Sequence, residues 1–335
     1  MKFGSVPLVE AEGAILAHSI AISGGVLKKG TLLDAGDVAR LTLAGIAQVT
    51  VARLESGDIG ENAAAARVAA AICGERLHTA EAFTGRANVL ADADGLAVID
   101  AEGVAALNAL DEGLTIATLA PLTRVATGTM VATVKIITFG LRENVVAQAE
   151  AIARARSAKI LRVAAFRPLR VALVLTAVPG GKASVVAKRG RVTGERVAGL
   201  GGTVVMEETV PHATGAVADA IGRGRNAGAD CILVFGASAI VDRGDVIPAG
   251  LVATGGEVVH LGMPVDPGNL LMLGRLDGVP VVGVPSCASS PKLNGFDWVL
   301  ERVAAGLPVG RADIIAMAVG GLLMEIPSRP QPRQG

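Results

Sequence analysis

The sequence predicts an α/β protein whose C-terminal half is a doubly wound, mostly parallel sheet, preceded by a mixed α+β N-terminal domain. Residues 170–176 form a continuous apolar run, which is typical of a parallel strand covered on both faces. Strand-like and helix-like segments alternate after it, as in successive βαβ units. The length of 335 residues favours two domains. We place them at residues 1–165 and 166–326, with a Pro- and Arg-rich disordered tail at residues 327–335.

The N-terminal half shows two clear helix starts. Asp34, with Asp37 three residues later, predicts the N-cap of a helix that Gly45 ends. Asp100 is the expected cap of a short helix that runs to residue 110. The other elements expected in this half are helices at residues 61–73 and 143–157 and strands at residues 48–54, 114–119 and 124–139.

The C-terminal half alternates regularly. The elements expected after the first strand are helices at residues 191–200, 215–227, 246–254 and 293–305, and strands at residues 203–208, 230–235, 257–261 and 279–284. Residues 222–227 spell the glycine fingerprint of a dinucleotide site, but they lie inside or at the end of a helical stretch. A functional fingerprint follows a strand and opens a helix, so we do not expect a dinucleotide site here.

Composition and charge exclude several classes of protein. Lys plus Arg equals Asp plus Glu at 31 each, so the chain lacks the excess of basic residues that is typical of a nucleic-acid-binding protein. Three widely spaced cysteines, no apolar leader and no apolar run of membrane-spanning length favour a cytoplasmic protein. The four histidines lack metal-ligand spacing. With one Trp, six Phe and no Tyr, the chain offers few rings for a flat ligand to stack on.

Three candidate ligand segments follow apolar strands, where open α/β sheets bind ligands. The first is residues 176–182, in which Thr176 ends the strand, Gly180 and Gly181 expose backbone N–H groups, and Lys182 adds positive charge. An ordinary Gly-rich loop is the alternative.

The second segment, residues 236–245, starts with Gly236 and Ser238 and carries two carboxylates. Asp242 and Asp245 either hold Mg²⁺ or a polar ligand, or serve locally, with Asp245 capping the next helix and Asp242 pairing with Arg243.

The third segment, residues 285–292, lies between a strand and a helix. Its hydroxyls and amides can bind an anion at the helix N-terminus, and Lys292 can neutralise it. Cys287 is either a reactive thiol or a small inert residue. A turn at residues 263–269 precedes it. The residues proposed as ligand contacts in the third segment and in this turn are Pro267, Gly268, Asn269, Pro285, Ser286, Cys287, Ser290 and Lys292.

Together these motifs resemble the molybdopterin-binding domain of molybdenum cofactor biosynthesis proteins. The resemblance covers about residues 167–310 and follows the order Gly236-Ala237-Ser238, a downstream Asp, the 264–269 turn and the 276–286 segment. Residues 28–31 and 45–51 are similar to the molybdotransferase branch, and the layout looks most like the molybdopterin-binding portion of proteins fused to a nucleotidyltransferase. The Gly-Ala-Ser, Pro-Gly-Asn and Pro-Ser-Cys turns depart from the family's Gly-Gly-Thr-Ser, Pro-Gly-Lys-Pro and Pro-Gly-Asn-Pro types.

The resemblance implies a molybdopterin-type α/β domain that binds molybdopterin or the molybdenum cofactor. It implies that Asp242 or Asp245 holds Mg²⁺ or the pterin amine, and that Arg86 and Lys135 contribute from the other domain or across a homodimer. Arg86 lies in a polar cluster at residues 82–88, read as a short connection, and Lys135 lies in an apolar strand; both are otherwise ordinary surface residues. Two alternatives remain open. One is a Mg²⁺-dependent molybdotransferase acting on adenylylated molybdopterin. The other is a non-catalytic carrier or sensor that works with a separate nucleotidyltransferase or a molybdoenzyme.

Overall fold

The computed structural model describes residues 1–323, and the tail expected at residues 327–335 lies outside them. The chain forms two compact units that divide between Ala165 and Phe166. We call residues 1–165 the N-terminal unit and residues 166–323 the C-terminal unit. None of the helices that the described residues form is long and apolar enough to cross a membrane. All three cysteines are free thiols.

The N-terminal unit contains two hydrophobic cores. The first joins buried residues between Leu8 and Val51 under an antiparallel sheet of order β1-β5-β2. As predicted, Asp34 and Asp37 form a capping box at the start of α1, and Gly45 follows the helix at a φ of 73°. The elements of this part are β1 (Lys2–Pro7), η1 (Leu8–Glu10), β2 (Ile15–Leu16), β3 (Ile20–Ile22), β4 (Gly25–Leu27), α1 (Ala35–Leu43) and β5 (Gln48–Arg53).

The second core packs α2, α3 and α4 with small antiparallel sheets of order β10-β12-β8-β7 and β11-β9-β14. Asp100 caps α3 by accepting the N–H of Gly103, as predicted. The elements are β6 (Asp58–Gly60), α2 (Glu61–Ile72), β7 (Leu77–Thr79), β8 (Arg86–Ala91), β9 (Gly95–Ile99), α3 (Ala101–Asn108), β10 (Leu114–Thr118), β11 (Arg124–Val125), β12 (Met130–Ile136), β13 (Gly140–Arg142), α4 (Glu143–Ala155) and β14 (Leu161–Ala165).

The structure refines two predictions in this unit. The β-rich run expected at residues 124–139 forms two strands, because a turn at residues 126–129 with Gly128 at a φ of 84° separates β11 from β12. The polar cluster at residues 82–88 is not only a connection. Thr84 and Gly85, both at positive φ, form the tight turn of a hairpin, and Arg86 begins strand β8.

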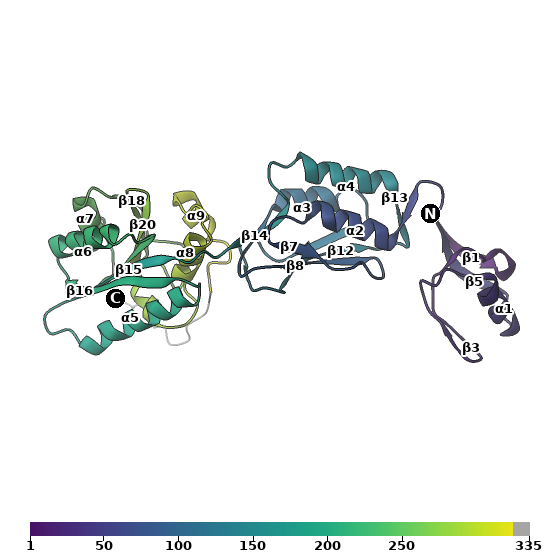
Figure 1. Cartoon of the computed structure of the whole chain (residues 1–335), viewed down its shortest axis with the longest axis horizontal. Coiled ribbons are helices and arrows are strands. Elements are labelled where there is room, and N and C mark those ends of the chain that lie inside the picture. The colour runs from purple at the N-terminus through teal and green to yellow at the C-terminus, as the bar shows by residue number, and fades with distance from the viewer. Residues whose placement is uncertain (324–335) are drawn as a thin grey trace, which may run out of the picture. The chain divides into compact units, whose positions relative to one another are not determined.

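The C-terminal unit is built on a six-stranded sheet of order β16-β15-β17-β20-β19-β18 (Figure 1). Strands β16, β15, β17 and β20 are parallel, and β19 runs antiparallel to β20 and to β18, so the sheet is mostly parallel as predicted. The elements are β15 (Arg170–Ala177), α5 (Ala183–Ala198), β16 (Thr203–Pro211), α6 (Thr214–Asn226), β17 (Cys231–Phe235), α7 (Val246–Ala253), β18 (Glu257–Leu261), β19 (Met272–Leu276), β20 (Val279–Val284), η2 (Ser286–Ser289), α8 (Gly295–Ala304) and α9 (Arg311–Ala316).

Helices cover both faces of this sheet. Alternate strand residues such as Leu173 and Val174 enter different cores, since successive side chains of a strand point to opposite faces. One core contains residues of α5 and α8, and the other contains residues of α6 and α7. Figure 1 shows α5 and α6 on opposite sides of β15 and β16. The sheet is therefore doubly wound, as the continuous apolar strand predicted.

Two boundaries in this unit differ from the prediction, and one strand was missed. Helix α5 begins at Ala183 and not at residue 191, and its internal Gly190 lies close to Leu175 of the sheet. Strand β16 runs on to Pro211 because its last residues still pair with the end of β15. Strand β19 was not predicted. Its Gly274 interrupts the apolar run, but a Cβ there would lie 2.2 Å from Leu251 Cδ2, so the close packing of α7 requires glycine.

Candidate functional site

The three loops predicted to bind ligand begin side by side at one edge of the sheet. Leu175 of β15 pairs with Phe235 of β17, and Phe235 pairs with Val284 of β20, all in parallel. Neighbouring strands lie about 4.8 Å apart, so the residues that follow these positions form one row. We call this row, with the first loop (residues 176–182), the second loop (236–245) and the third loop (285–292), the carboxyl edge.

Thr176 joins the first two loops. Its side chain is 1% exposed, and its hydroxyl accepts the N–H of Ala237 at 2.6 Å and donates to the carbonyl of Phe235 at 3.2 Å. A buried hydroxyl needs such partners, because an unsatisfied polar group in the interior is costly. Thr176 therefore positions the start of the second loop.

His212 extends this arrangement to the surface. Its Nδ1 lies 3.0 Å from Thr176 Oγ1, and its Nε2 lies 3.3 Å from the hydroxyl oxygen of the exposed Ser238. Thr176 donates its proton to the Phe235 carbonyl, so an imidazole with a proton on Nδ1 can donate to Thr176 Oγ1, and its Nε2 lies within hydrogen-bond distance of Ser238. Thr176, His212 and Ser238 thus form one hydrogen-bonded row that ends in an exposed hydroxyl. We call them the polar row.

The prediction from sequence missed His212. It follows Pro211, the last residue of β16, and so occupies the same kind of position as the three predicted loops. The expected end of this strand at residue 208 placed His212 away from any strand end. His212 also lacks metal-ligand spacing to the other histidines, and its partners are the hydroxyls of Thr176 and Ser238.

Arg189 of α5 fixes the second loop from the side of the helix. Its guanidinium donates to the carbonyl of Gly236 at 2.9 Å and lies 4.8 Å from the ring centre of Phe235. Burial lowers the pKa of Arg189. Gly236 itself has no room for a side chain, because a Cβ would lie 2.6 Å from the carbonyl oxygen of Ser238. The turn into the second loop therefore depends on both residues.

Both predicted acids shape the second loop. Asp245 Oδ2 accepts the N–H groups of Val241 at 2.6 Å and Asp242 at 3.0 Å, and these bonds, that of Val241 first, lower the pKa of Asp245. Asp242 Oδ1 accepts the N–H of Gly244 at 2.7 Å. The local alternatives hold only in part. Asp245 occupies the N-cap position of α7 but makes no side-chain cap bond, and the Arg243 guanidinium donates to the Val258 carbonyl at 3.0 Å and not to Asp242.

The fit of this acidic pair to Mg²⁺ is partial. Residues 1–323 contain no group of three or more His, Cys, Asp or Glu side chains that could hold a metal ion. Each of the two carboxylates uses one oxygen for backbone N–H groups and keeps the other. Mg²⁺ in proteins is commonly bound by one or two carboxylates together with water and substrate phosphates. Asp242 and Asp245 therefore fit Mg²⁺ only where a phosphate ligand completes the shell.

The third loop is fixed by α5 and α8. Arg196 lies against Asp297 at 2.6 Å and donates to the carbonyls of Ala288 and Ser290, each at 2.7 Å. Asn294, which is 1% exposed, caps α8 and places its Nδ2 3.1 Å from Cys287 Sγ. The Lys292 side chain remains exposed. These bonds hold Pro285, Ser286, Cys287, Ser290 and Lys292 at the edge next to the second loop.

The Pro267-Gly268-Asn269 turn packs against the N-terminus of α8. The Pro267 carbonyl accepts the N–H of Gly295 at 2.8 Å, and a Cβ on Gly268 would lie 2.9 Å from the same nitrogen. Asn269 Nδ2 donates to the Met263 carbonyl at 3.4 Å. The bonds of these three residues thus fix the turn against the start of α8.

Three helix N-termini open at the carboxyl edge. Helices α5, α6 and α7 follow the parallel strands β15, β16 and β17, and their N-cap residues Lys182, Ala213 and Asp245 make no side-chain cap bond. Uncapped N–H groups and the helix dipole attract anions. Gly180, Gly181 and Lys182 of the first loop are exposed beside this start of α5. The edge is therefore suited to an anionic ligand.

Arg86 and Lys135 of the N-terminal unit have partners within that unit. Arg86 donates to the hydroxyl of Thr133 at 2.9 Å, and Lys135 donates to the carbonyl of Thr84. Thr133 in turn donates to Asn88 at 2.8 Å. The partner that a Lys in an apolar strand needs is thus a backbone carbonyl.

Comparison with known proteins gives only distant likenesses. Residues 5–53 match a family described as a domain of unknown function (DUF8806). No curated protein matches the sequence. Among solved structures, a molybdopterin biosynthesis MoeA protein from Pyrococcus horikosii is 14% identical, with a TM-score of 0.33, over 91% of this chain and 75% of that one.

Two proteins from Pyrococcus furiosus also align. A molybdenum cofactor biosynthesis protein is 13% identical with a TM-score of 0.25, over 94% of this chain and 65% of that one. A tungsten cofactor synthesizing protein MoaB is 16% identical with a TM-score of 0.28, over 41% of this chain and 91% of that one. These superpositions are too weak to carry a functional conclusion.

Proposed function

We propose that the C-terminal unit binds molybdopterin or the molybdenum cofactor at the carboxyl edge, and that the chain acts in molybdenum cofactor biosynthesis. The resemblance of the loop motifs suggests this ligand class. The observation that carries the proposal is the polar row of Thr176, His212 and Ser238 beside three uncapped helix N-termini. A ligand with a phosphate and a hydrogen-bonding ring needs both features.

The phosphate of the pterin would lie at the helix N-termini. Lys182 ends the first loop and Lys292 ends the third, and neither ammonium group has a hydrogen-bond or ion-pair partner among residues 1–323. A flexible Lys neutralises phosphate as a point charge. The ring would meet the Ser238 hydroxyl, His212 and the backbone of Gly236, since the chain has few aromatic side chains for stacking.

Asp242 and Asp245 give the finer version of this function. A carboxylate can accept the pterin amine, and the two acids can hold Mg²⁺ together with a ligand phosphate. A bound Mg²⁺ would supply charge stabilisation for phosphoryl chemistry on an adenylylated pterin. Asp245 stays ionised because two backbone N–H groups donate to it, and it is therefore suited to a ligand role and not to proton transfer at neutral pH.

Titration of the full chain with molybdopterin tests the binding proposal. Trp298 in α8 is the only Trp and provides an intrinsic fluorescence signal from this unit. We expect Ser238→Ala and Asp242→Asn to weaken binding about tenfold each, the scale of one hydrogen bond to a charged or polar ligand group.

The matched control is Asp277→Asn. Asp277 lies in the β19–β20 turn at the other end of the strands, at a φ of 48° that Asn tolerates. It should bind as the wild type does. No binding by any of these proteins would overturn the ligand assignment, and equal affinity in all four would remove the carboxyl edge from the site.

Incubation with adenylylated molybdopterin, molybdate and Mg²⁺ separates the transferase from the carrier. A transferase would turn the substrate over only with Mg²⁺ and would lose that activity in Asp242→Asn. A carrier would bind without turnover and would co-purify with a nucleotidyltransferase or a molybdoenzyme. The homodimer that the resemblance implies is tested in the same preparations by light scattering.

A further inference from the structure

A cavity of about 690 Å³ lies at the edge of the sheet opposite the carboxyl edge. It is formed before the first residues of β15 and β17, around the β19–β20 turn, and by the end of α8 with residues 306–309. None of the three loops of the carboxyl edge lines it. Its volume is within the range of small-molecule sites. We call it the amino-edge cavity.

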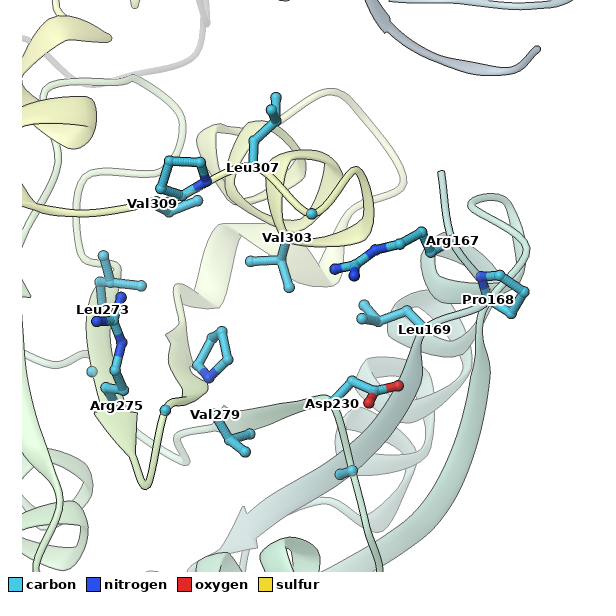
Figure 2. Close-up of a pocket in the computed structure, with 16 residues that line it drawn as sticks. Arg167, Pro168, Leu169, Asp230, Leu273, Arg275, Val279, Val303, Leu307 and Val309 are labelled. Carbon is cyan, nitrogen blue, oxygen red and sulfur yellow. The ribbon is translucent and has the colours of Figure 1, made fainter. Parts of the chain in front are cut away.

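Most of the residues that line this cavity have apolar side chains, and polar atoms of the backbone and of the charged side chains form the rest of its surface. Figure 2 shows Leu169, Val279 and Val303 around its middle. Three prolines, Pro168, Pro280 and Pro308, stiffen its rim and bring no N–H donors of their own. Such walls favour a ligand with an apolar body.

The charged residues of the cavity are two arginines and one acid. In Figure 2, Arg167 and Arg275 lie on opposite sides, and the Arg167 guanidinium points inward between Val303 and Leu169. Neither guanidinium makes a hydrogen bond or ion pair with the residues that the structure describes. Asp230 does not neutralise them, because its carboxylate accepts the backbone N–H of Arg170 at 2.9 Å and points away from the middle of the cavity.

Arg167 is held in place by a glycine. Gly306 has a φ of 67°, and a Cβ on it would lie 2.8 Å from Arg167 Cζ, so the guanidinium rests directly on the glycine backbone. The Arg167 backbone N–H donates to the Ala304 carbonyl at 2.9 Å. A positioned guanidinium at an apolar wall is a ready partner for a carboxylate, sulfonate or phosphate.

We propose that the amino-edge cavity binds a small organic anion. The anionic group contacts the guanidinium of Arg167, with Arg275 adding charge from the other side, and the apolar body packs on Leu169, Val279 and Val303. This site is separate from the carboxyl edge and does not depend on the pterin assignment.

The test uses the full chain and 8-anilinonaphthalene-1-sulfonate, a sulfonate with an apolar body that fluoresces when it binds. N-phenyl-1-naphthylamine has the same apolar body without the sulfonate and serves as the matched probe. We expect saturable one-to-one binding of the sulfonate, with energy transfer from Trp298 in α8, and much weaker binding of the uncharged probe.

Variants then locate the probe. Arg167→Gln should weaken binding of the sulfonate about tenfold, the scale of a lost charge-assisted bond, and leave the uncharged probe unchanged. Gly306→Ala keeps every charge but displaces the guanidinium, so it should weaken binding in the same way. Arg275→Gln provides a third variant if one of these fails to fold.

Arg191→Gln is the charge-matched control, because Arg191 is an exposed residue of α5 outside the cavity. It should bind as the wild type does, and so should Ser238→Ala at the carboxyl edge. Equal affinity of wild type and Arg167→Gln would overturn the proposal, as would equally tight binding of the two probes or an equal loss in Arg191→Gln.

Discussion

The two edges of the six-stranded sheet differ in how their polar groups are used. At the carboxyl edge, side chains bond to one another and to backbone, and the polar row ends in an exposed hydroxyl. At the amino edge, apolar side chains surround two arginines whose guanidinium groups make no hydrogen bond or ion pair with the described residues. Parallel βα units bring helix N-termini to the first edge only. Open volume and convergent polar groups therefore occur at different places in this unit.

The largest effect is expected from Arg196, the residue that holds the third loop at the carboxyl edge. Arg196→Gln removes an ion pair in which both side chains are nearly buried, at 10% and 15% exposure, and leaves Asp297 and three backbone carbonyls without this donor. We expect a loss of about 3 kcal/mol in the free energy of unfolding, the usual scale for breaking a buried pair. Urea unfolding followed by Trp298 fluorescence measures it.

Arg191→Gln is the matched control for this change. Its pair with Glu195 lies one turn away on the same helix, and both side chains are more than half exposed. An exposed pair contributes less than about 1 kcal/mol, so the unfolding midpoint should hardly move. Equal losses in the two variants would show that the third loop is not fixed by Arg196.

Thr176 and Thr193 test whether the polar row stabilises the edge. Both are 1% exposed, but Thr176 bonds to Ala237 and Phe235, whereas the Thr193 hydroxyl has no partner among residues 1–323. Thr176→Val should cost about 1–2 kcal/mol because it leaves the partly buried N–H of Ala237 without its acceptor. Thr193→Val should leave the stability unchanged or raise it. A loss of equal size in both variants would argue against the polar row.

The pH dependence of stability tests the hydrogen bonds that Asp245 accepts in the second loop. Its folded-state pKa is lowered, so its stabilising contribution is complete above the ordinary aspartate pKa and is lost as the pH falls through the folded value. The difference in stability between wild type and Asp245→Asn should therefore be constant near pH 7 and shrink only in strongly acidic solution. A difference that shrinks already above the ordinary aspartate pKa would contradict the bonds from Val241 and Asp242.

The smallest effect is a difference in labelling rate. Cys287 is exposed at the carboxyl edge, whereas Cys231 is buried and its pKa is raised to about 12 by burial. N-ethylmaleimide should modify Cys287 in the native protein and not Cys231, as peptide mapping would show. Molybdopterin should slow the reaction at Cys287, and 8-anilinonaphthalene-1-sulfonate should not. Protection of Cys287 by 8-anilinonaphthalene-1-sulfonate and not by molybdopterin would contradict the assignment of the two ligands to the two edges.

Elements with strong local signals were predictable from the sequence. The apolar run of β15 predicted the parallel, doubly wound sheet, and Asp34 and Asp100 marked helix starts that the structure confirms. The rule that ligand loops follow parallel strands also located three segments that begin in one row, at Thr176, Gly236 and Pro285.

Features that depend on packing between distant segments were not predictable. The end of β16 is set by pairing with β15, and the error there concealed His212. Gly274 interrupts the apolar pattern of β19. The structure requires glycine there because Leu251 of α7 packs against it, and this contact is not visible in the local sequence. Arg189 and Arg196 bond to loops about 50 to 100 residues away in the sequence, and a local sequence pattern cannot predict contacts at that separation. The amino-edge cavity, with Arg167 resting on Gly306, has the same origin.

The most direct test is a crystal structure of the full chain with bound molybdopterin. We predict ligand density at the carboxyl edge, with the phosphate at the N-termini of α5, α6 or α7 and the ring within hydrogen-bond distance of Ser238 or His212. Pterin density in the amino-edge cavity against Arg167, with an unoccupied carboxyl edge in the same crystal, would contradict the proposed function.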